Sequence, residues 1–232
     1  MPESTVIKLA KGVWILLYPG LTPWPDSLTL GASIEDCIVL YDTGSGAPES
    51  ILTLSSSLAE IGIKPWKIDY AIISHAHLPS SGGSYWLHDS HNTTIAARNP
   101  DSRWIETGDP VKTAANEYGL PFRPVPVGVE IRREGPLPGC TSKINVMFTP
   151  GHTPGSISLF IDAPDATVIA VADALGRLSR RWDSDEKLWQ SSVEKIARID
   201  ADFLCTSTSC LDRRAASRLL EELAEKGAEW VD

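Results

Sequence analysis

Short runs of apolar and β-branched residues alternate with segments of helical spacing along the 232-residue chain. Runs of four to eight β-branched and apolar residues predict strands, and apolar residues three or four positions apart predict amphipathic helices. The expected strands are 5–8, 13–18, 28–33, 37–41, 70–73, 93–97, 144–148, 156–161, 168–172 and 203–206. The expected helices are 49–61, 81–88, 111–118, 185–199 and 213–226.

The expected strands fall into two blocks, with helices after each block. This order favours two sheets with helices outside, which is a layered α/β architecture. Neither a GxGxxG nor a GxxxxGK[ST] phosphate loop is present in the sequence, which disfavours dinucleotide and P-loop chemistry. Prolines at 19, 23 and 25 predict a loop around Trp24.

Composition narrows the class of protein further. Apolar residues make up 42% of the chain and charged residues 22%, which excludes a disordered, collagen-like or coiled-coil chain. The net charge of −9 disfavours nucleic acid and anionic membranes as partners. The chain has no apolar run of the ~18 residues of a membrane helix and no signal-peptide pattern, so we expect a cytoplasmic protein. A homo-oligomer remains open.

Three of the five histidines stand in positions that suit a metal. His75 and His77 follow the expected strand 70–73, and side chains two apart in an extended segment face the same way. His152 lies in the stiff loop Pro150-Gly-His-Thr-Pro-Gly-Ser156, and Asp173 follows the strand 168–172. Zinc and iron favour imidazole nitrogen. Taken singly, the two histidines could be polar loop residues, and Asp173 could be a turn residue or a helix cap.

The order of strand, SHAH, helix, then strand, GHTPGS, strand, then strand and Asp resembles the metallo-β-lactamase superfamily. The run from Cys37 through Asp42 to Gly44, the approach Ile61-Gly-Ile-Lys-Pro65 and the pair Gly82-Gly83 are similar to further family motifs. The resemblance implies one domain over residues 1–232 with a four-layer αββα sandwich. It also implies a metal at one edge, between the two sheets.

The chain departs from the family in one half of the site. The family motif HxHxDH here has Pro79 and Ser80 in place of its Asp and its third His. The window of the last family histidine, 205–210, contains no His, and Ser207 aligns there. We therefore expect one divalent metal, zinc or else iron, held by the residues that remain. These residues are His75, His77, His152 and Asp173.

A mononuclear hydrolase of a small ester, thioester or phosphoester follows from this set, because three imidazoles and an open position lower the pKa of zinc-bound water. Asp173 and Ser80 are the candidates for moving the proton. One alternative is an iron dioxygenase of the persulfide type, whose two His and one Asp match His75, His152 and Asp173. The other is a binding module without catalysis.

Several further residues complete the expected site. By the resemblance, Asp42 lies beneath the metal and accepts hydrogen bonds that hold the His75 loop; the alternative is a carboxylate that serves only a turn. By the same resemblance, Ser207 lies beside the metal ligands. A small anionic substrate is expected because arginine suits carboxylate or phosphate. Its candidate contacts are Arg177, Arg180, Arg181 and the aromatic wall of Trp24. Cys205 and Cys210 could ligate a metal, stay as buried thiols or form a disulfide.

Overall fold

The computed structural model describes residues 5–22 and 25–232, and it contains two sheets. The first sheet runs β1 (Ile7–Ala10), β2 (Val13–Leu17), β3 (Thr29–Ile34), β4 (Cys37–Tyr41), β5 (Tyr70–Ile72), β6 (Thr94–Ala97) and β7 (Val129–Glu130). Its first four strands are antiparallel, and β4 to β7 are parallel. The second sheet runs β12 (Cys210–Asp212), β11 (Phe203–Thr206), β10 (Thr167–Ala172), β9 (Ile157–Asp162) and β8 (Ile144–Phe148).

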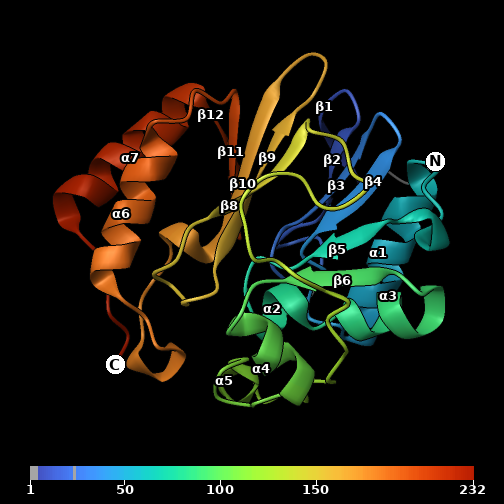
Figure 1. Ribbon diagram of the computed structural model, residues 1–232, viewed down its shortest axis with the longest axis horizontal. Helices are drawn as coiled ribbons and strands as arrows, with labels where there is room; N and C mark the ends of the chain where they lie inside the picture. The colour runs from blue at the N-terminus through green and yellow to red at the C-terminus, as the bar shows by residue number, and fades with distance from the viewer. Residues whose placement is uncertain (1–4, 23–24) are drawn as a thin grey trace.

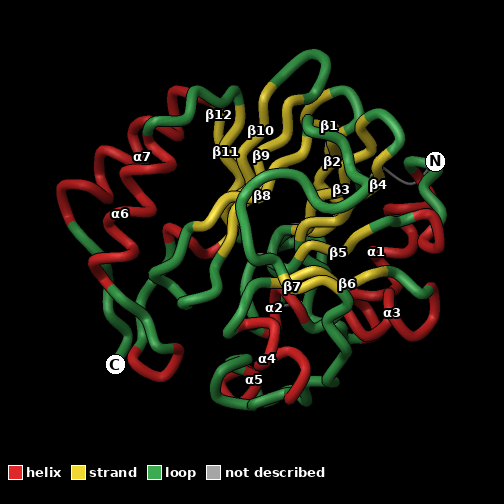
Figure 2. The backbone as a smooth tube through the Cα atoms, viewed as in Figure 1, coloured by secondary structure: helices red, strands yellow, loops and turns green. Residues whose placement is uncertain are grey.

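Helices cover the outer face of each sheet (Figures 1 and 2). On the first sheet lie α1 (Pro48–Glu60), α3 (Ser84–His91) and α4 (Asp101–Thr107). On the second lie α6 (Glu186–Ala197) and α7 (Arg213–Lys226). The short elements are α2 (Leu78–Ser81), α5 (Ala115–Tyr118) and the 3-10 turns η1 (Pro65–Lys67), η2 (Asp173–Leu175) and η3 (Arg180–Trp182).

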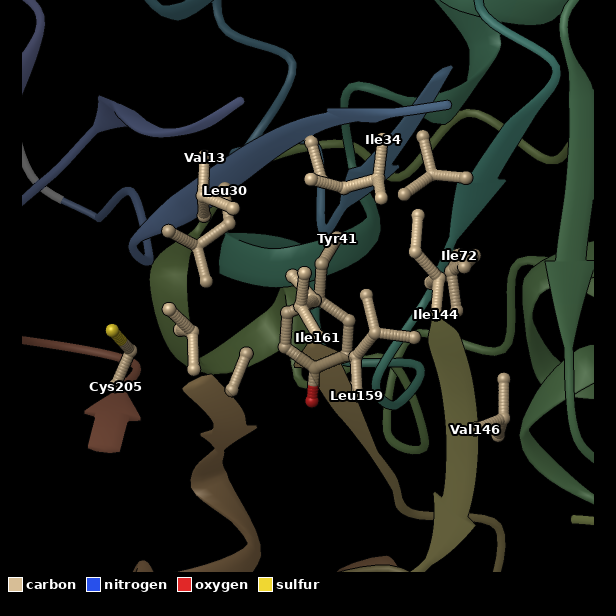
Figure 3. Packing of buried hydrophobic residues seen from close by; sticks show 14 of the residues in the cluster. Val13, Leu30, Ile34, Tyr41, Ile72, Ile144, Val146, Leu159, Ile161 and Cys205 are labelled. Carbon is tan, nitrogen blue, oxygen red and sulfur yellow. The ribbon is translucent and has the colours of Figure 1, made fainter. Parts of the chain in front are cut away.

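The inner faces of the two sheets pack together and form the central core (Figure 3). Val13 and Leu30 of the first sheet belong to the same buried cluster as Leu159 and Ile161 of the second. Burying each such side chain stabilises the fold by about 1.5–3 kcal/mol. Tyr41 crosses between the sheets and donates a hydrogen bond to the Ile157 carbonyl at 2.8 Å, which satisfies its buried hydroxyl.

The expected α/β architecture, an αββα sandwich, is confirmed. Differences lie in short elements. The first strand is Ile7–Ala10 instead of 5–8, and the sequence pattern did not predict α4, β7 or β12. Strands of two or three residues, such as β7 and β12, carry no measurable periodicity, so only their pairing partners define them.

The four cysteines form two disulfides, Cys37–Cys140 and Cys205–Cys210. Of the three alternatives for Cys205 and Cys210, the structure has the disulfide, and neither sulfur can ligate a metal, because a sulfur bonded to sulfur offers no thiolate. No helix in residues 5–22 and 25–232 is both long and apolar enough to cross a membrane. Trp24, expected to wall the site, lies outside the described residues.

Candidate metal centre

Three loops from both sheets bring four potential ligands together. His75 and His77 follow β5, His152 lies between β8 and β9, and Asp173 follows β10. One ligand atom from each of the four lies within 4.8 Å of the others. The His77 Nδ1 to His152 Nε2 distance is 3.1 Å, and Asp173 Oδ2 lies 3.4 Å from His75 Nε2 and 4.0 Å from His152 Nε2.

His75 is oriented from beneath by a chain of two hydrogen bonds. Asp42 directly follows β4, the parallel neighbour of β5, and its carboxylate accepts the backbone N–H and the hydroxyl of Ser74, each at 2.8 Å. The Ser74 hydroxyl has then used its only proton, so its oxygen accepts from His75 Nδ1 at 2.8 Å. His75 Nε2 consequently faces the cluster. Burial raises the pKa of Asp42 to about 7.

His152 is oriented in the same way by a backbone carbonyl. Its Nδ1 lies 2.6 Å from the Arg177 carbonyl, which can only accept, so Nε2 carries the lone pair. Gly151 has φ +139°, and a Cβ there would lie 2.3 Å from the Trp189 Cα, so the loop needs glycine to approach α6. Burial lowers the pKa of His152 to about 4, and the imidazole is therefore neutral at neutral pH.

His77, the third histidine of the cluster, packs against Trp182. Its ring centroid lies 4.4 Å from that of Trp182, which also lies 5.2 Å from the His152 ring. Trp182 is 7% exposed, and its indole N–H has no hydrogen-bond partner within residues 5–22 and 25–232. Burial lowers the pKa of His77 well below its usual value, with the charges of His75 and His152 adding to the effect.

Asp173 carries the negative charge of the cluster. Burial alone would raise its pKa, but the hydrogen bond and charge of His75, the charge of His152 and a hydrogen bond from Ser207 hold it well below its usual range. The Asp173 side chain is 28% exposed, whereas the three histidines are 2–4% exposed. Solvent therefore meets the cluster at Asp173.

The four residues fit a divalent metal. His75 Nε2 is buried and lies 3.4 Å from Asp173 Oδ2. Burial lowers the pKa of His75, but the nearby carboxylates, Asp173 first among them, raise it by more, so a metal bound there would displace the proton of Nε2. Ligands of a tetrahedral zinc at ~2.0–2.1 Å stand about 3.3 Å apart. The 3.1 and 3.4 Å separations agree with that spacing, and the 4.0 Å between His152 Nε2 and Asp173 Oδ2 is longer. Three neutral imidazoles and one carboxylate are a donor set that zinc and iron both accept.

Pro79 and Ser80 occupy two positions where the family has metal ligands, and neither belongs to the cluster. Pro79 stands in the first turn of α2, where proline fits, and its carbonyl accepts the Ser27 N–H at 3.0 Å. Ser80 is fully buried, and its hydroxyl has no hydrogen-bond partner within residues 5–22 and 25–232. The four residues described above are the single group of this kind in residues 5–22 and 25–232.

The three arginines that the sequence grouped together lie in different surroundings. Arg177 is exposed, and its charge lowers the pKa of both His152 and Tyr118. Arg181 lies 3.7 Å from Glu117 in an ion pair, and Arg180 is exposed in η3. Of the three, Arg177 is therefore the one whose charge acts on the cluster.

Sequence reasoning missed Ser74, Trp182, Tyr118 and Asp101. Ser74 precedes His75, so its position in the motif could have suggested it. Burial and the charge of Asp173 raise the pKa of Tyr118 to about 12, so its phenol is protonated at neutral pH. No local pattern connects Trp182 or Asp101 to the histidines, because their contacts span long stretches of chain.

Comparison with known families agrees with this geometry. The model of the metallo-beta-lactamase superfamily matches residues 30–208, which include all four clustered residues. The chain belongs to this superfamily. Solved structures share the fold. A metallo-beta-lactamase of Cronobacter sakazakii with a HARLDQ motif superposes with a TM-score of 0.76 at 18% identity, over 94% of this chain and 93% of that one.

A further structural match is the metallo-beta-lactamase GOB-18 of Elizabethkingia meningoseptica, with a TM-score of 0.75 at 15% identity over 97% and 93% of the two chains. Among curated sequences, the probable metallo-hydrolase YqgX of Bacillus subtilis is 21% identical over 75% of this chain and 80% of its own length. A hydroxyacylglutathione hydrolase of Brucella ovis is 24% identical over 67% of this chain, which spans 56% of that relative.

Proposed function

We propose that the chain is a hydrolase that uses one divalent metal, zinc, against a small anionic ester, thioester or phosphoester. The observation that supports this most is the convergence of three buried histidines and Asp173 with their ligand atoms within 4.8 Å. Hydrogen bonds to Ser74 and the Arg177 carbonyl already orient two of the imidazoles. Zinc bound there would polarise the scissile group and lower the pKa of water to about 7.

The protein's own groups define how a substrate approaches. Trp182 covers His77 and His152, so the substrate enters at the exposed edge of Asp173. The Asp173 carboxylate is ionised at neutral pH, so it would supply the negatively charged ligand of the metal. Arg177 is exposed and its carbonyl lies 2.6 Å from His152 Nδ1, so its positive charge would be available to a substrate at the cluster. An arginine suits a carboxylate or phosphate on the substrate.

A thioester is the class to test first, because the Brucella relatives are named hydroxyacylglutathione hydrolases. The iron dioxygenase alternative needs two His and one carboxylate with open positions. His77 Nδ1, at 3.1 Å from His152 Nε2, supplies a third imidazole and favours zinc.

The expected cytoplasmic location stays a prediction. The two disulfides count against it, because disulfides persist mainly in oxidising compartments.

Metal content tests the proposal directly. We expect elemental analysis of the purified protein to give about one zinc per chain, and His152→Ala to abolish it. The matched control is His88→Ala, because His88 lies on α3 outside the cluster and pairs with Asp89. Iron in place of zinc would favour the dioxygenase. Two tight and similar sites, or no metal after zinc loading, would contradict the proposal.

A further inference from the structure

A buried carboxylate stands behind the cluster without contributing a ligand. Asp101, the first residue of α4, is 1% exposed. Its Oδ1 accepts the Ala76 N–H and the Thr153 hydroxyl, each at 2.8 Å, and its Oδ2 accepts the Gly155 N–H at 2.9 Å. Every one of these three hydrogen bonds ends on a loop that carries a histidine of the cluster.

The partners of Asp101 lie directly beside those histidines. Ala76 separates His75 from His77, and Thr153 follows His152. One side chain therefore joins the loop after β5 to the loop between β8 and β9, and so joins the first sheet to the second. A backbone hydrogen bond from Ile157 to Ser74, at 2.9 Å, connects the same segments outside the histidine-bearing stretch.

The backbone is shaped around this carboxylate. A Cβ at Gly155 would lie 2.3 Å from Asp101 Oδ2, so any other residue there would displace the carboxylate. Burying a carboxylate costs several kcal/mol unless hydrogen bonds compensate for the lost water. A core that needed stability alone could use an apolar residue here. The three hydrogen bonds therefore indicate that Asp101 holds the two histidine loops at a defined distance from each other.

We propose that Asp101 is the positioning residue of the metal centre: it fixes the separation of the two histidine loops so that the three imidazoles converge. This role rests on the metal-binding function proposed above. Asp101 acts through backbone and hydroxyl groups and does not touch the reacting atoms. Loss of a partner that orients metal ligands typically lowers metal affinity by about 10–100-fold.

Single substitutions at Asp101 and at Thr153 remove different hydrogen bonds of the Asp101 carboxylate. In Asp101→Asn, the amide oxygen can keep the bonds from Ala76 and Thr153, but the amide N–H₂ then faces the Gly155 N–H, which is also a donor. Thr153→Val removes one hydroxyl at nearly constant shape, and Thr153→Ser restores it. The Thr153 hydroxyl also contacts Ser156 Oγ at 2.7 Å, so the Val and Ser variants are compared with each other.

The control is Asp202→Asn. Asp202 accepts the N–H and the hydroxyl of Thr167 at 2.8 and 3.0 Å and pairs with Arg213. Its hydrogen bonds to a backbone N–H and a threonine hydroxyl resemble those of Asp101, but the Asp202 side chain is 43% exposed and Asp101 is 1% exposed. The Asp202 contacts lie at the start of β10, whereas Asp173 follows its end. A variant that only loosens the fold should behave like this control.

The experiment measures zinc affinity by competition with a chelator and the visible spectrum of the cobalt(II)-loaded protein, which reports ligand geometry. We expect Asp101→Asn to lower zinc affinity about 10–100-fold and to alter the cobalt spectrum. Thr153→Val should act in the same direction by less, and Thr153→Ser should match wild type.

The outcomes distinguish this inference from the proposed function. A wild-type protein that binds neither zinc nor cobalt overturns both. If wild type binds metal, then an unchanged cobalt spectrum in Asp101→Asn, or an equal loss in Asp202→Asn, overturns the positioning role alone. Should Asp101→Asn fail to fold, the Thr153 pair decides, and equal affinities of its Val and Ser variants contradict the role.

Discussion

Ser207 donates a hydrogen bond to Oδ1 of Asp173, while Oδ2 of the same carboxylate faces His75 and His152. Ser207 lies in the loop between β11 and β12, where the sequence lacks the last histidine of the family. A serine hydroxyl is a poor metal ligand but a good donor to a carboxylate. The substitution therefore replaces a possible ligand by a group that orients one.

Removing this hydroxyl should weaken metal binding. We expect Ser207→Ala to lower zinc affinity about 10–100-fold, because Asp173 loses the donor that fixes its orientation. Ser207→Thr keeps the hydroxyl and should stay near wild type. The control is Thr208→Val, whose hydroxyl contacts Thr206 within its own loop. Chelator competition measures all three, and equal affinities of the Ala and Thr variants would refute the role of Ser207.

Charge at the entrance should decide substrate preference. We expect Arg177→Gln to raise KM for an anionic thioester about tenfold, equivalent to ~1.4 kcal/mol, and to leave a neutral analogue of the same size unchanged. The double variant Arg180→Gln and Arg181→Gln should have the smaller effect, because Arg181 pairs with Glu117. Steady-state kinetics on the two substrates provides the measurement. A larger effect of the double variant would mean that Arg180 and Arg181, and not Arg177, bind the negative charge of the substrate.

Restoring the missing ligands should add a second metal. The variant carries Pro79→Asp, Ser80→His and Ser207→His, at the three positions where the family supplies ligands and this chain does not. Metal analysis should then rise from about one to two per chain. Hydrolysis should increase by ~10²-fold or more, because a second ion can stabilise the leaving group. Loss of native activity without a second metal would show that Pro79 and Ser80 serve a different reaction.

The buried Asp42 should make the metal-free protein pH-sensitive. Its pKa is raised to about 7 in the folded state, against 3.8 as the ordinary value. Between these two values the folded state keeps a proton that the unfolded state has released. The contribution of Asp42 to stability therefore falls as pH rises from about 4 to 7 and is constant above that.

Asp42→Asn removes this titration, and its amide can still serve both groups of Ser74. Compared with wild type, the metal-free variant should gain stability progressively between pH 4 and 7. Urea unfolding at several pH values measures the difference between the two proteins. A constant difference across this range would mean that Asp42 is ionised throughout.

The two disulfides should differ in their contribution to stability. Cys37 and Cys140 are 103 residues apart, and closing a loop of that length stabilises by about 4.7 kcal/mol in the chain-entropy estimate. Cys205 and Cys210 are 5 apart, for which the same estimate gives about 2 kcal/mol. Replacing each pair by serines and measuring unfolding in denaturant tests this order. Free thiols titrated in the unreduced protein would show that the pairs do not form.

The sequence by itself determined the layers of the fold. The strands at Val13–Leu17 and Cys37–Tyr41 and the helix at Arg213–Lys226 follow from local apolar spacing, and each lies where the pattern predicts it. Local spacing succeeds because each of these elements buries one face, and the apolar residues of that face recur at a regular interval within the element. The four clustered residues were likewise found from motifs, as they follow recognisable strands.

Only the tertiary structure decided what surrounds those residues. Asp101 contacts Ala76 across 25 positions of sequence, and Trp182 contacts His77 across far more, with no periodicity connecting either pair. Cys37 and Cys140 were paired by the packing of their segments and by no spacing rule. Such contacts depend on how the two sheets are placed against each other. That placement is a property of the whole core, so no local stretch of sequence encodes it.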